Sequence, residues 1–200
     1  MNIFPKTFTV PSEKNGLITV EQFLGCTKVW AGGFEQSGPY VTKLWRQALT
    51  HMPKNQKVAD ILIVGLGGGC SLRTIEKRYP DARITVVEWD RAMVDIALRL
   101  HLFTRMPEIL VGDVCSVLPT LHIKFDLILS DAFFGGVPEP RLGEDSHTQS
   151  LAHVLAPSGR IILNAFKTPL LIPINGPYLH HEETWEFEYN QVVMFSRSTN

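Results

Sequence analysis

The stretch ILIVGLGGGCSLR, residues 61–73, decides the fold. Its first four residues are aliphatic, which is typical of a strand buried on both faces. Four glycines then fall between positions 65 and 69, and helical sequence follows. Glycine permits a positive φ and lets a ligand touch bare backbone, and the N-terminus of the next helix offers free N–H groups. The stretch predicts a strand, a ligand-binding turn and a helix, although tight packing of strand against helix would also explain the glycines.

Strands and helices alternate along most of the chain. Further aliphatic runs predict strands, and they lie at 84–88, 108–112, 126–130 and 160–166. Apolar residues at helical spacing predict helices around 71–79, 91–103 and 146–155. This alternation predicts a Rossmann-like, doubly wound α/β fold with a mostly parallel sheet. The runs 184–189 and 191–196 are nearly adjacent, so they must pair antiparallel or form one bulged strand, and we expect an antiparallel strand at the C-terminus.

Both ends of the chain depart from this alternation. Runs of alternating polarity at 18–23 and 27–30 predict a small N-terminal β-hairpin module over residues 1–36. Residues 37–200 would form the Rossmann-like domain, beginning with a helix that Pro53 ends. Prolines at 169, 173 and 177 exclude a regular helix in the segment 167–183, which predicts a shortened C-terminal part. The apolar run PLLIPI in this segment favours a homodimer.

Composition narrows the class of protein. A chain of 200 residues with 44% apolar content can bury one core. Its 19 basic residues nearly balance its 20 acidic residues, so we expect a small-molecule substrate and no nucleic acid. The three cysteines show no zinc spacing, and His180 and His181 fit an exposed loop better than a ligand set, so we expect no metal. No signal pattern or membrane-length apolar run occurs, and we expect a cytoplasmic protein with no membrane partner.

Three acids follow successive predicted strands, where ligands of open α/β sheets bind. Glu88 ends the second strand, where a carboxylate can accept hydrogen bonds from both ribose hydroxyls of NAD or of an adenosyl sulfonium. Asp113 follows the third strand, and we expect it to accept a hydrogen bond from an adenine amino group, with the backbone of Val114 beside it. Asp131 follows the fourth strand and would face the reactive end of the ligand. Each acid alone could equally cap a helix, but three together indicate a nucleoside site.

These residues resemble those of the spermidine synthase-like (polyamine aminopropyltransferase) family, within the class I S-adenosylmethionine-dependent methyltransferase fold. The likeness covers about residues 16–166 and the last strand, and it rests on VGLGGGCSLR, VEWD, VGD and SDAF. The resemblance implies that Gln36 forms a lid over the ligand. It also implies that Asp113 and Val114 hold the adenine and that Asp131 lies at the reaction site. The sulfur and ribose side of the ligand would be held by Gly65, Gly67, Gly68, Gly69 and Glu88.

The sequence departs from this family where aminopropyltransferases bind amines. Those enzymes usually carry an acid in the glycine loop, where this chain has Gly68, and a second acid after the fourth strand, where it has Phe134. They also carry an acid-rich segment after the lid glutamine, where this chain reads SGPY. A dicationic diamine calls for several carboxylates. An acid at position 68 would attract the lone ammonium of decarboxylated S-adenosylmethionine but repel the carboxylate of S-adenosylmethionine itself, so its loss favours the latter ligand.

The sequence thus predicts a transferase that moves a methyl group from S-adenosylmethionine to an unidentified acceptor. Displacement at a sulfonium carbon needs mainly alignment and desolvation, with Asp131 as base or orienting group and with Gln36 and Tyr40 on the acceptor side. Phe133 and Phe134 could stack on a planar acceptor, although core positions fit them better. Two alternatives stay open: a divergent aminopropyltransferase of polyamine biosynthesis that uses decarboxylated S-adenosylmethionine, and a non-catalytic adenosyl-binding partner subunit. An NAD-dependent reductase fits less well.

Overall fold

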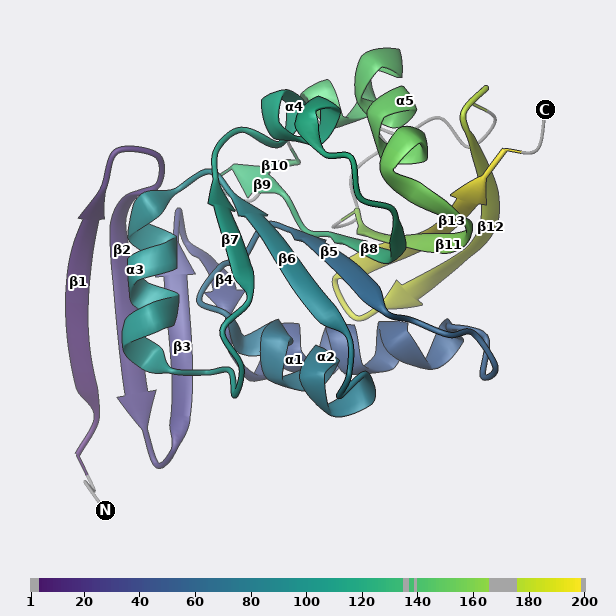
Figure 1. The fold of residues 1–200 in the computed structure, drawn as a ribbon. Helices are drawn as coiled ribbons and strands as arrows, with labels where there is room; N and C mark the ends of the chain where they lie inside the picture. Colours follow the sequence, from purple (N-terminus) through teal and green to yellow (C-terminus); the bar gives the residue numbers. More distant parts are fainter. Residues whose placement is uncertain (1–3, 135–136, 139, 166–175, 199–200) are drawn as a thin grey trace.

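The centre of the molecule is a seven-stranded sheet (Figure 1). The computed structural model describes residues 4–134, 137–138, 140–165 and 176–198. The strand order is β12-β13-β11-β8-β5-β6-β7, and β11, β8, β5, β6 and β7 run parallel. The bounds are β5 (Asp60–Val64), β6 (Arg83–Glu88), β7 (Glu108–Val111), β8 (Phe125–Ser130), β11 (Leu155–Asn164), β12 (Leu179–Phe187) and β13 (Asn190–Arg197). The predicted α/β fold with a mostly parallel sheet is confirmed.

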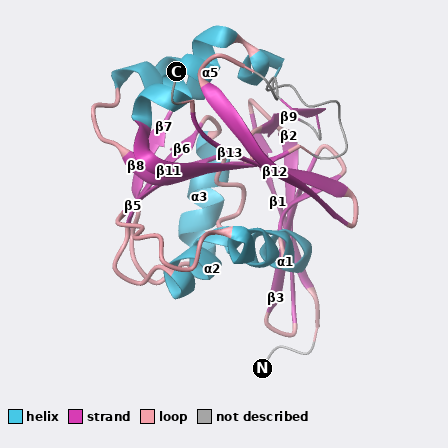
Figure 2. Ribbon diagram, turned by 90° about the vertical axis from the view of Figure 1, so that its right-hand side faces the viewer, coloured by secondary structure: helices cyan, strands magenta, loops and turns pink. Residues whose placement is uncertain are grey.

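Helices cover both faces of this sheet (Figure 2). On one face lie α1 (Pro39–Ala48), η1 (Leu49–His51) and α2 (Cys70–Arg78), and on the other lie α4 (Val114–Val117), η2 (Leu118–Thr120), η3 (Pro140–Gly143) and α5 (Asp145–Val154). Successive residues of β5 point to opposite faces, so Ile61 and Ile63 pack with α1 and α2, whereas Leu62 and Val64 pack with α5. This two-sided burial is why the strand is aliphatic throughout.

A separate four-stranded antiparallel sheet precedes this core, with the order β1-β2-β3-β4. Its strands are β1 (Lys6–Ser12), β2 (Gly16–Phe23), β3 (Cys26–Ala31) and β4 (Phe34–Ser37). The predicted hairpin is β2 and β3, but the prediction of a hairpin alone was incomplete. Strand β1 contains Pro11, which a sheet tolerates at an edge position such as this one. A two-stranded sheet, β9 (Phe133–Phe134) and β10 (Val137–Pro138), completes the strands of the described ranges.

Helix α3 (Arg91–Leu100) joins the two larger sheets (Figure 1). Its Met93 and Ile96 are buried against Ile18, Val20 and Val29 of the N-terminal sheet. The helix ends earlier than the predicted residue 103, because His101 adopts a left-handed conformation with φ of 48° and its N–H bonds to the carbonyl of Ala97.

The C-terminal strand pair begins earlier than predicted. His180 and His181 lie within β12, which pairs antiparallel with β13, so their prediction as a loop was wrong. The imidazole of His181 contacts the ring of Phe195 edge-on. The predictions that rest on Pro169, Pro173 and the run 169–174 lie outside the described residues.

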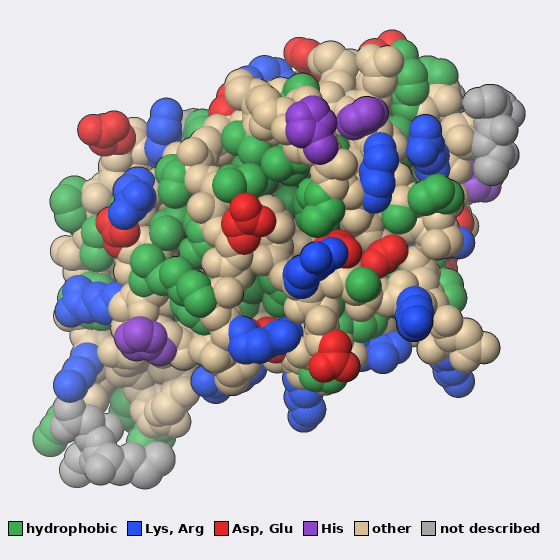
Figure 3. Space-filling model, in the orientation of Figure 1, with side chains coloured by type: hydrophobic (Ala, Val, Ile, Leu, Met, Phe, Trp, Pro, Cys, Tyr) green, Lys and Arg blue, Asp and Glu red, His purple; other side chains and the backbone are tan. Residues whose placement is uncertain are grey.

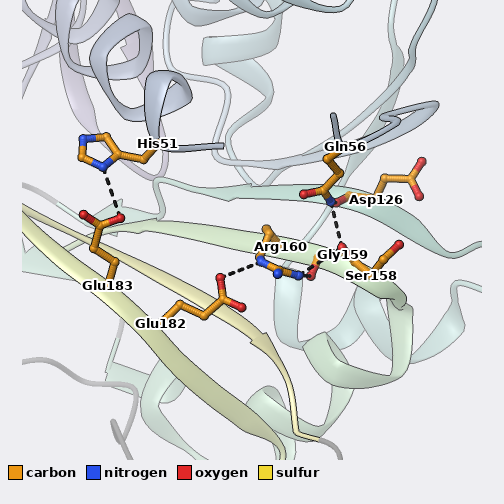
Figure 4. A network of polar contacts seen from close by, with 8 residues as sticks. All are labelled: His51, Gln56, Asp126, Ser158, Gly159, Arg160, Glu182 and Glu183. Carbon is orange, nitrogen blue, oxygen red and sulfur yellow. Dashed lines mark hydrogen bonds and ion pairs between the residues drawn. The ribbon is translucent and has the colours of Figure 1, made fainter. Parts of the chain in front are cut away.

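Polar side-chain contacts join β12 to β11 and to η1 (Figure 4). The Nε of Arg160 on β11 donates to Oε2 of Glu182 at 2.6 Å, and the two side chains are 21% and 23% exposed. Nδ1 of His51 after α1 lies 3.2 Å from Oε2 of Glu183, and the His51 ring stacks on Trp185 with centroids 4.0 Å apart.

Within the described ranges, no helix combines the length and apolarity that a bilayer crossing needs.

A single carboxylate links the N-terminal sheet to the larger sheet. Asp90 is 3% exposed; its Oδ1 accepts the N–H of Ala92 at 2.9 Å and so caps α3. Its Oδ2 accepts hydrogen bonds from the Ser12 hydroxyl at 2.6 Å and the Asn15 amide at 2.5 Å, both in or after β1. The turn between β1 and β2 is therefore held at the start of α3.

Replacing Asp90 by alanine should lower the free energy of unfolding by about 2–3 kcal/mol, because the cap is lost and two polar groups lose their acceptor. Urea denaturation measures the change. The matched control is Asp95→Ala on the same helix, where an exposed pair with Arg91 is removed and a change within about 0.5 kcal/mol is expected. Equal losses in the two variants would contradict the link between the sheets.

Candidate functional site

A cavity opens where the parallel strands of the large sheet end. It holds about 640 Å³ of empty space, counting the part open to solvent, and we call it the strand-end cavity. Segments following β5, β6, β7 and β8 line it, together with residues from the N-terminal sheet and α3. The lining residues are Asn15, Gln36, Val64, Gly65, Gly67, Val87, Glu88, Trp89, Met93, Gly112, Asp113, Val114, Asp131, Ala132, Phe133 and Arg141. The position is the one at which open α/β sheets bind ligands.

Seven of the nine predicted site residues meet at this cavity. They are Gln36, Gly65, Gly67, Glu88, Asp113, Val114 and Asp131. Gly68 and Gly69 are not among its described lining residues. A Cβ on Gly68 would lie 2.5 Å from Cγ2 of Val29 and 2.7 Å from Cβ of Ser37, so this glycine packs against the N-terminal sheet. Gly69 has φ of +85°, precedes the first residue of α2 and faces Ala97 of α3.

Gly65 and Gly67 bring the backbone of the glycine loop against two other segments. Gly65 has φ of +87°, and a Cβ there would lie 2.5 Å from the carbonyl oxygen of Asp131. Gly67 has φ of +52°, and a Cβ there would lie 2.3 Å from the carbonyl oxygen of Gln36. Both residues thus need glycine for conformation and for space.

Glu88 fixes the glycine loop by accepting a backbone hydrogen bond from it. The side chain is 5% exposed, Oε2 accepts the N–H of Leu66 at 2.7 Å, and Oε1 accepts the N–H of Asp90 at 2.9 Å. Burial raises the pKa of Glu88, while the N–H groups of Asp90, Leu66 and Gly67 act in the opposite direction. Each carboxylate oxygen has two lone pairs, so both can accept a further hydrogen bond from a ligand.

Asp113 pairs with an arginine that the sequence analysis missed. Its Oδ1 accepts the N–H of Cys115 at 2.9 Å and caps α4, and its Oδ2 accepts from Nη1 of Arg141 at 2.7 Å. Partial burial acts to raise the pKa of Asp113, but the hydrogen bonds and the charge of Arg141 outweigh it and hold the pKa below its ordinary value. Arg141 is the one basic residue between positions 131 and 145, which is the only sequence signal that could have indicated it.

Asp131 is held by two side-chain donors. Nε1 of Trp45 donates to Oδ2 at 3.1 Å, and Nδ2 of Asn164 donates to Oδ1 at 2.8 Å. Burial raises the pKa of Asp131, whereas the two hydrogen bonds oppose that rise. The chain of contacts continues, because Nδ2 of Asn190 donates to Oδ1 of Asn164 at 2.6 Å and the Tyr40 hydroxyl donates to Oδ1 of Asn190. The position and rotamer of Asp131 are thereby fixed from α1, β11 and β13.

A second cavity adjoins the first on the side of α1, and we call it the side cavity. Five residues line both cavities: Gln36, Gly65, Gly67, Asp131 and Phe133. The side cavity is otherwise lined by Phe34, Glu35, Tyr40, Val41, Leu44, Asn164 and Asn190. Asp131 therefore lies where the cavities meet. Phe133 reaches both, and the side chain of Phe134 lies outside the described residues.

Glu35 is an acid of the side cavity that the sequence analysis did not count. It directly precedes the lid glutamine, whereas the acid-rich segment of aminopropyltransferases was sought after that glutamine. Oε1 of Glu35 accepts the N–H of Tyr40 at 3.0 Å, and Oε2 lies 3.9 Å from Nζ of Lys28. The sequence signal that could have indicated Glu35 was its position next to the predicted lid residue Gln36, on what is the short strand β4.

Comparison with known families agrees with this architecture. Residues 42–173 match the Spermine/spermidine synthase domain. The chain belongs to this family. A polyamine aminopropyltransferase of Vibrio vulnificus is 28% identical over 162 residues, which cover 78% of this chain and 51% of the relative. This member of the family therefore spans about half the length of that curated relative.

Methyltransferases are similar to the chain as well. An eEF1A lysine and N-terminal methyltransferase of Danio rerio is 31% identical over 124 residues, 56% of this chain and 18% of the relative. Among solved structures, a probable spermidine synthase from Corynebacterium glutamicum matches with a TM-score of 0.68 and 20% identity, over 81% of this chain and 64% of that one. Human methyltransferase-like protein 13 in complex with SAH matches with a TM-score of 0.62 and 22% identity, over 80% and 82%. These two structures support the fold.

The close approach at Gly67 can be tested directly. Gly67→Ala should weaken binding of S-adenosylhomocysteine by at least about tenfold, because the new Cβ must displace the backbone of Gln36 from the cavity wall. Isothermal titration calorimetry measures the affinity. Gly33→Ala is the control, since Gly33 also has a positive φ, of +83°, but nothing lies within 4 Å of the new Cβ, and this variant should leave the affinity unchanged. If both variants bind as the parent does, Gly67 does not shape the site.

Proposed function

We propose that this chain is an S-adenosylmethionine-dependent methyltransferase. The observation that carries the proposal is the packing of Gly68. Aminopropyltransferases of the family usually carry an acid at this position, as the resemblance implies. Here a side chain at position 68 would collide with Val29 and Ser37. At this end of the strand-end cavity the wall is formed by the backbone of the glycine loop and by the side-chain amide of Gln36. A lone ammonium at that end of the ligand lacks the carboxylate it would need there.

The residues of the strand-end cavity fit the parts of an adenosyl ligand. The free lone pairs of Glu88 suit the two ribose hydroxyls, because the carboxylate is already oriented by the glycine loop. Asp113 and the backbone of Val114 suit the adenine edge, next to Arg141.

The N–H groups of Leu66, Gly69 and Cys70 are already bonded within the protein. The carboxylate of the methionine part would therefore meet the side-chain amide of Gln36, which lines both cavities and can donate to an anion. The residues that would contact the ligand all line an accessible cavity, which also argues against a pure scaffold.

Asp131 is placed to serve the acceptor. Bound S-adenosylmethionine supplies a methyl group on a sulfonium, an excellent leaving group. The chain supplies alignment, exclusion of water and a proton acceptor. Asp131 lies where both cavities meet, and Trp45 and Asn164 fix its rotamer. Burial raises its pKa, which makes it a stronger base. An acceptor nitrogen or oxygen in the side cavity would lose its proton to Oδ1 or Oδ2 of Asp131.

Aminopropyl transfer is the second candidate, and Glu35 favours it. With Asp131, this residue gives the side cavity two carboxylates, which a diamine requires. Glu35, however, is already engaged by the N–H of Tyr40 and approached by Lys28. The two reactions are therefore distinguished better by the residues around the donor ligand, where the packing of Gly68 excludes an acid, than by the residues around the acceptor.

Calorimetric titration with S-adenosylmethionine and with its decarboxylated form tests the proposal. We expect S-adenosylmethionine to bind at least about tenfold more tightly, because only it carries a carboxylate that the side-chain amide of Gln36 can bind, and the glycine loop holds no acid that would repel it. Glu88→Gln is the control variant, and it should weaken both ligands alike, since they share the same ribose. Tighter binding of the decarboxylated form would contradict methyl transfer and support aminopropyl transfer.

The charge of Asp131 should be visible in ligand preference. S-adenosylmethionine carries a positive sulfur and S-adenosylhomocysteine a neutral one, so an ionised Asp131 favours the former by about fivefold. Because the pKa of Asp131 is raised from 3.8, this preference should be small at pH values just above 3.8 and should grow as the pH rises further and Asp131 ionises. The titration of Glu88 cancels in the ratio because both ligands have the same ribose.

Affinities measured over a series of pH values give the ratio. In Asp131→Asn the ratio should be independent of pH. A pH-dependent ratio in that variant would show that another group faces the sulfur and would remove Asp131 from the reaction site.

A further inference from the structure

A third hollow lies away from both cavities, between α1, α2 and the turn that joins β2 to β3. We call it the basic groove. Its walls are formed by the turn and the start of β3, by α1 and η1, and by α2, with Leu102 beside them. On α1, Thr42 and Arg46 line the groove, whereas Val41 and Leu44 line the side cavity, so the helix separates the two.

Four cationic side chains line this groove: Arg46, Arg73, Lys77 and Arg78. All four are exposed, and Figure 3 shows Lys and Arg side chains along the lower edge of the molecule, where Figure 1 has α1 and α2. Among the described lining residues none is Asp or Glu, and within the described ranges no ion pair engages any of the four. Elsewhere on the surface Lys43, Arg83 and Arg91 are each paired with an acid. The groove is therefore a local concentration of uncompensated positive charge.

Helix dipoles explain only part of this arrangement. Arg46 lies in the last turn of α1, and Lys77 and Arg78 lie in the last turn of α2, where positive charge is favoured. Arg73 lies in the first turn of α2, where positive charge is disfavoured and where no acid is present. Arg73 and Lys77 are also four residues apart, so they share a face of the helix and repel each other. A bound anion would relieve both unfavourable terms.

We propose that the basic groove binds a compact ligand that carries two or more phosphate groups, at a site separate from the strand-end and side cavities. Arginine and lysine together suit closely spaced phosphates, through forked hydrogen bonds and point charge respectively. No Phe, Tyr or Trp is among the described lining residues, so the groove offers no platform on which nucleic-acid bases stack. The chain as a whole has a formal net charge of −1, so this cluster of four cations stands out on a nearly neutral protein, as suits a small polyanion.

Titration of the purified chain with sodium tripolyphosphate tests this proposal, by calorimetry at low salt (about 50 mM). One molecule should bind per chain, and the affinity should fall as salt increases. The double variant Arg73→Gln/Lys77→Gln should bind roughly tenfold more weakly. The matched control is Lys54→Gln/Lys57→Gln, which removes the same charge from two exposed lysines outside the groove and should bind as the parent does.

Each other outcome overturns the proposal. No binding of tripolyphosphate, or an equal loss in the control variant, would show that the charge forms no site. Loss of S-adenosylmethionine binding in the double variant would show that the groove is not separate from the strand-end cavity. A duplex oligonucleotide that binds more tightly than tripolyphosphate, and only when Arg73 and Lys77 are present, would replace the small polyanion with a nucleic-acid backbone. These readouts do not depend on which transfer reaction the chain performs.

Discussion

The structure of the site depends on how closely the glycine loop packs. Gly65 and Gly67 touch the carbonyl oxygens of Asp131 and Gln36, leaving no space for a Cβ at either position. This contact brings the segment after β8 and the strand β4 to one place. Glu88 then fixes the loop by accepting the N–H of Leu66. Backbone contacts thus hold the part of the cavity wall that the glycine loop forms.

The N-terminal sheet is part of the site. It supplies Gln36 to both cavities, and its Val29 and Ser37 fill the space beside Gly68. Burial of this sheet against α3 and the hydrogen bonds to Asp90 keep it in place. Glycine at position 68 therefore has a structural cause, because Val29 and Ser37 fill the space that a side chain would need. The electrostatic consequence is that the glycine loop carries no charged side chain.

The sequence predicted the elements whose signals are local. Aliphatic runs predicted the parallel strands, and the acids after them predicted Glu88, Asp113 and Asp131 at one edge, because parallel strands end together. Trp45, Asn164 and Asn190 were not predicted, since each reaches Asp131 directly or through Asn164 only after distant segments pack. Gly68 and Gly69 were expected to touch the ligand, but which side of a loop faces a cavity depends on tertiary contacts that spacing does not encode.

A crystal structure of the chain with S-adenosylhomocysteine tests the central claim most directly. The account predicts that the ribose hydroxyls bond to Glu88, that the adenine lies beside Asp113 and Val114, and that the sulfur lies beside the residues shared by the two cavities, with Asp131 facing it. The amino-acid end should meet the side-chain amide of Gln36. A ligand bound outside the strand-end cavity, or one whose ribose makes no contact with Glu88, would contradict the account.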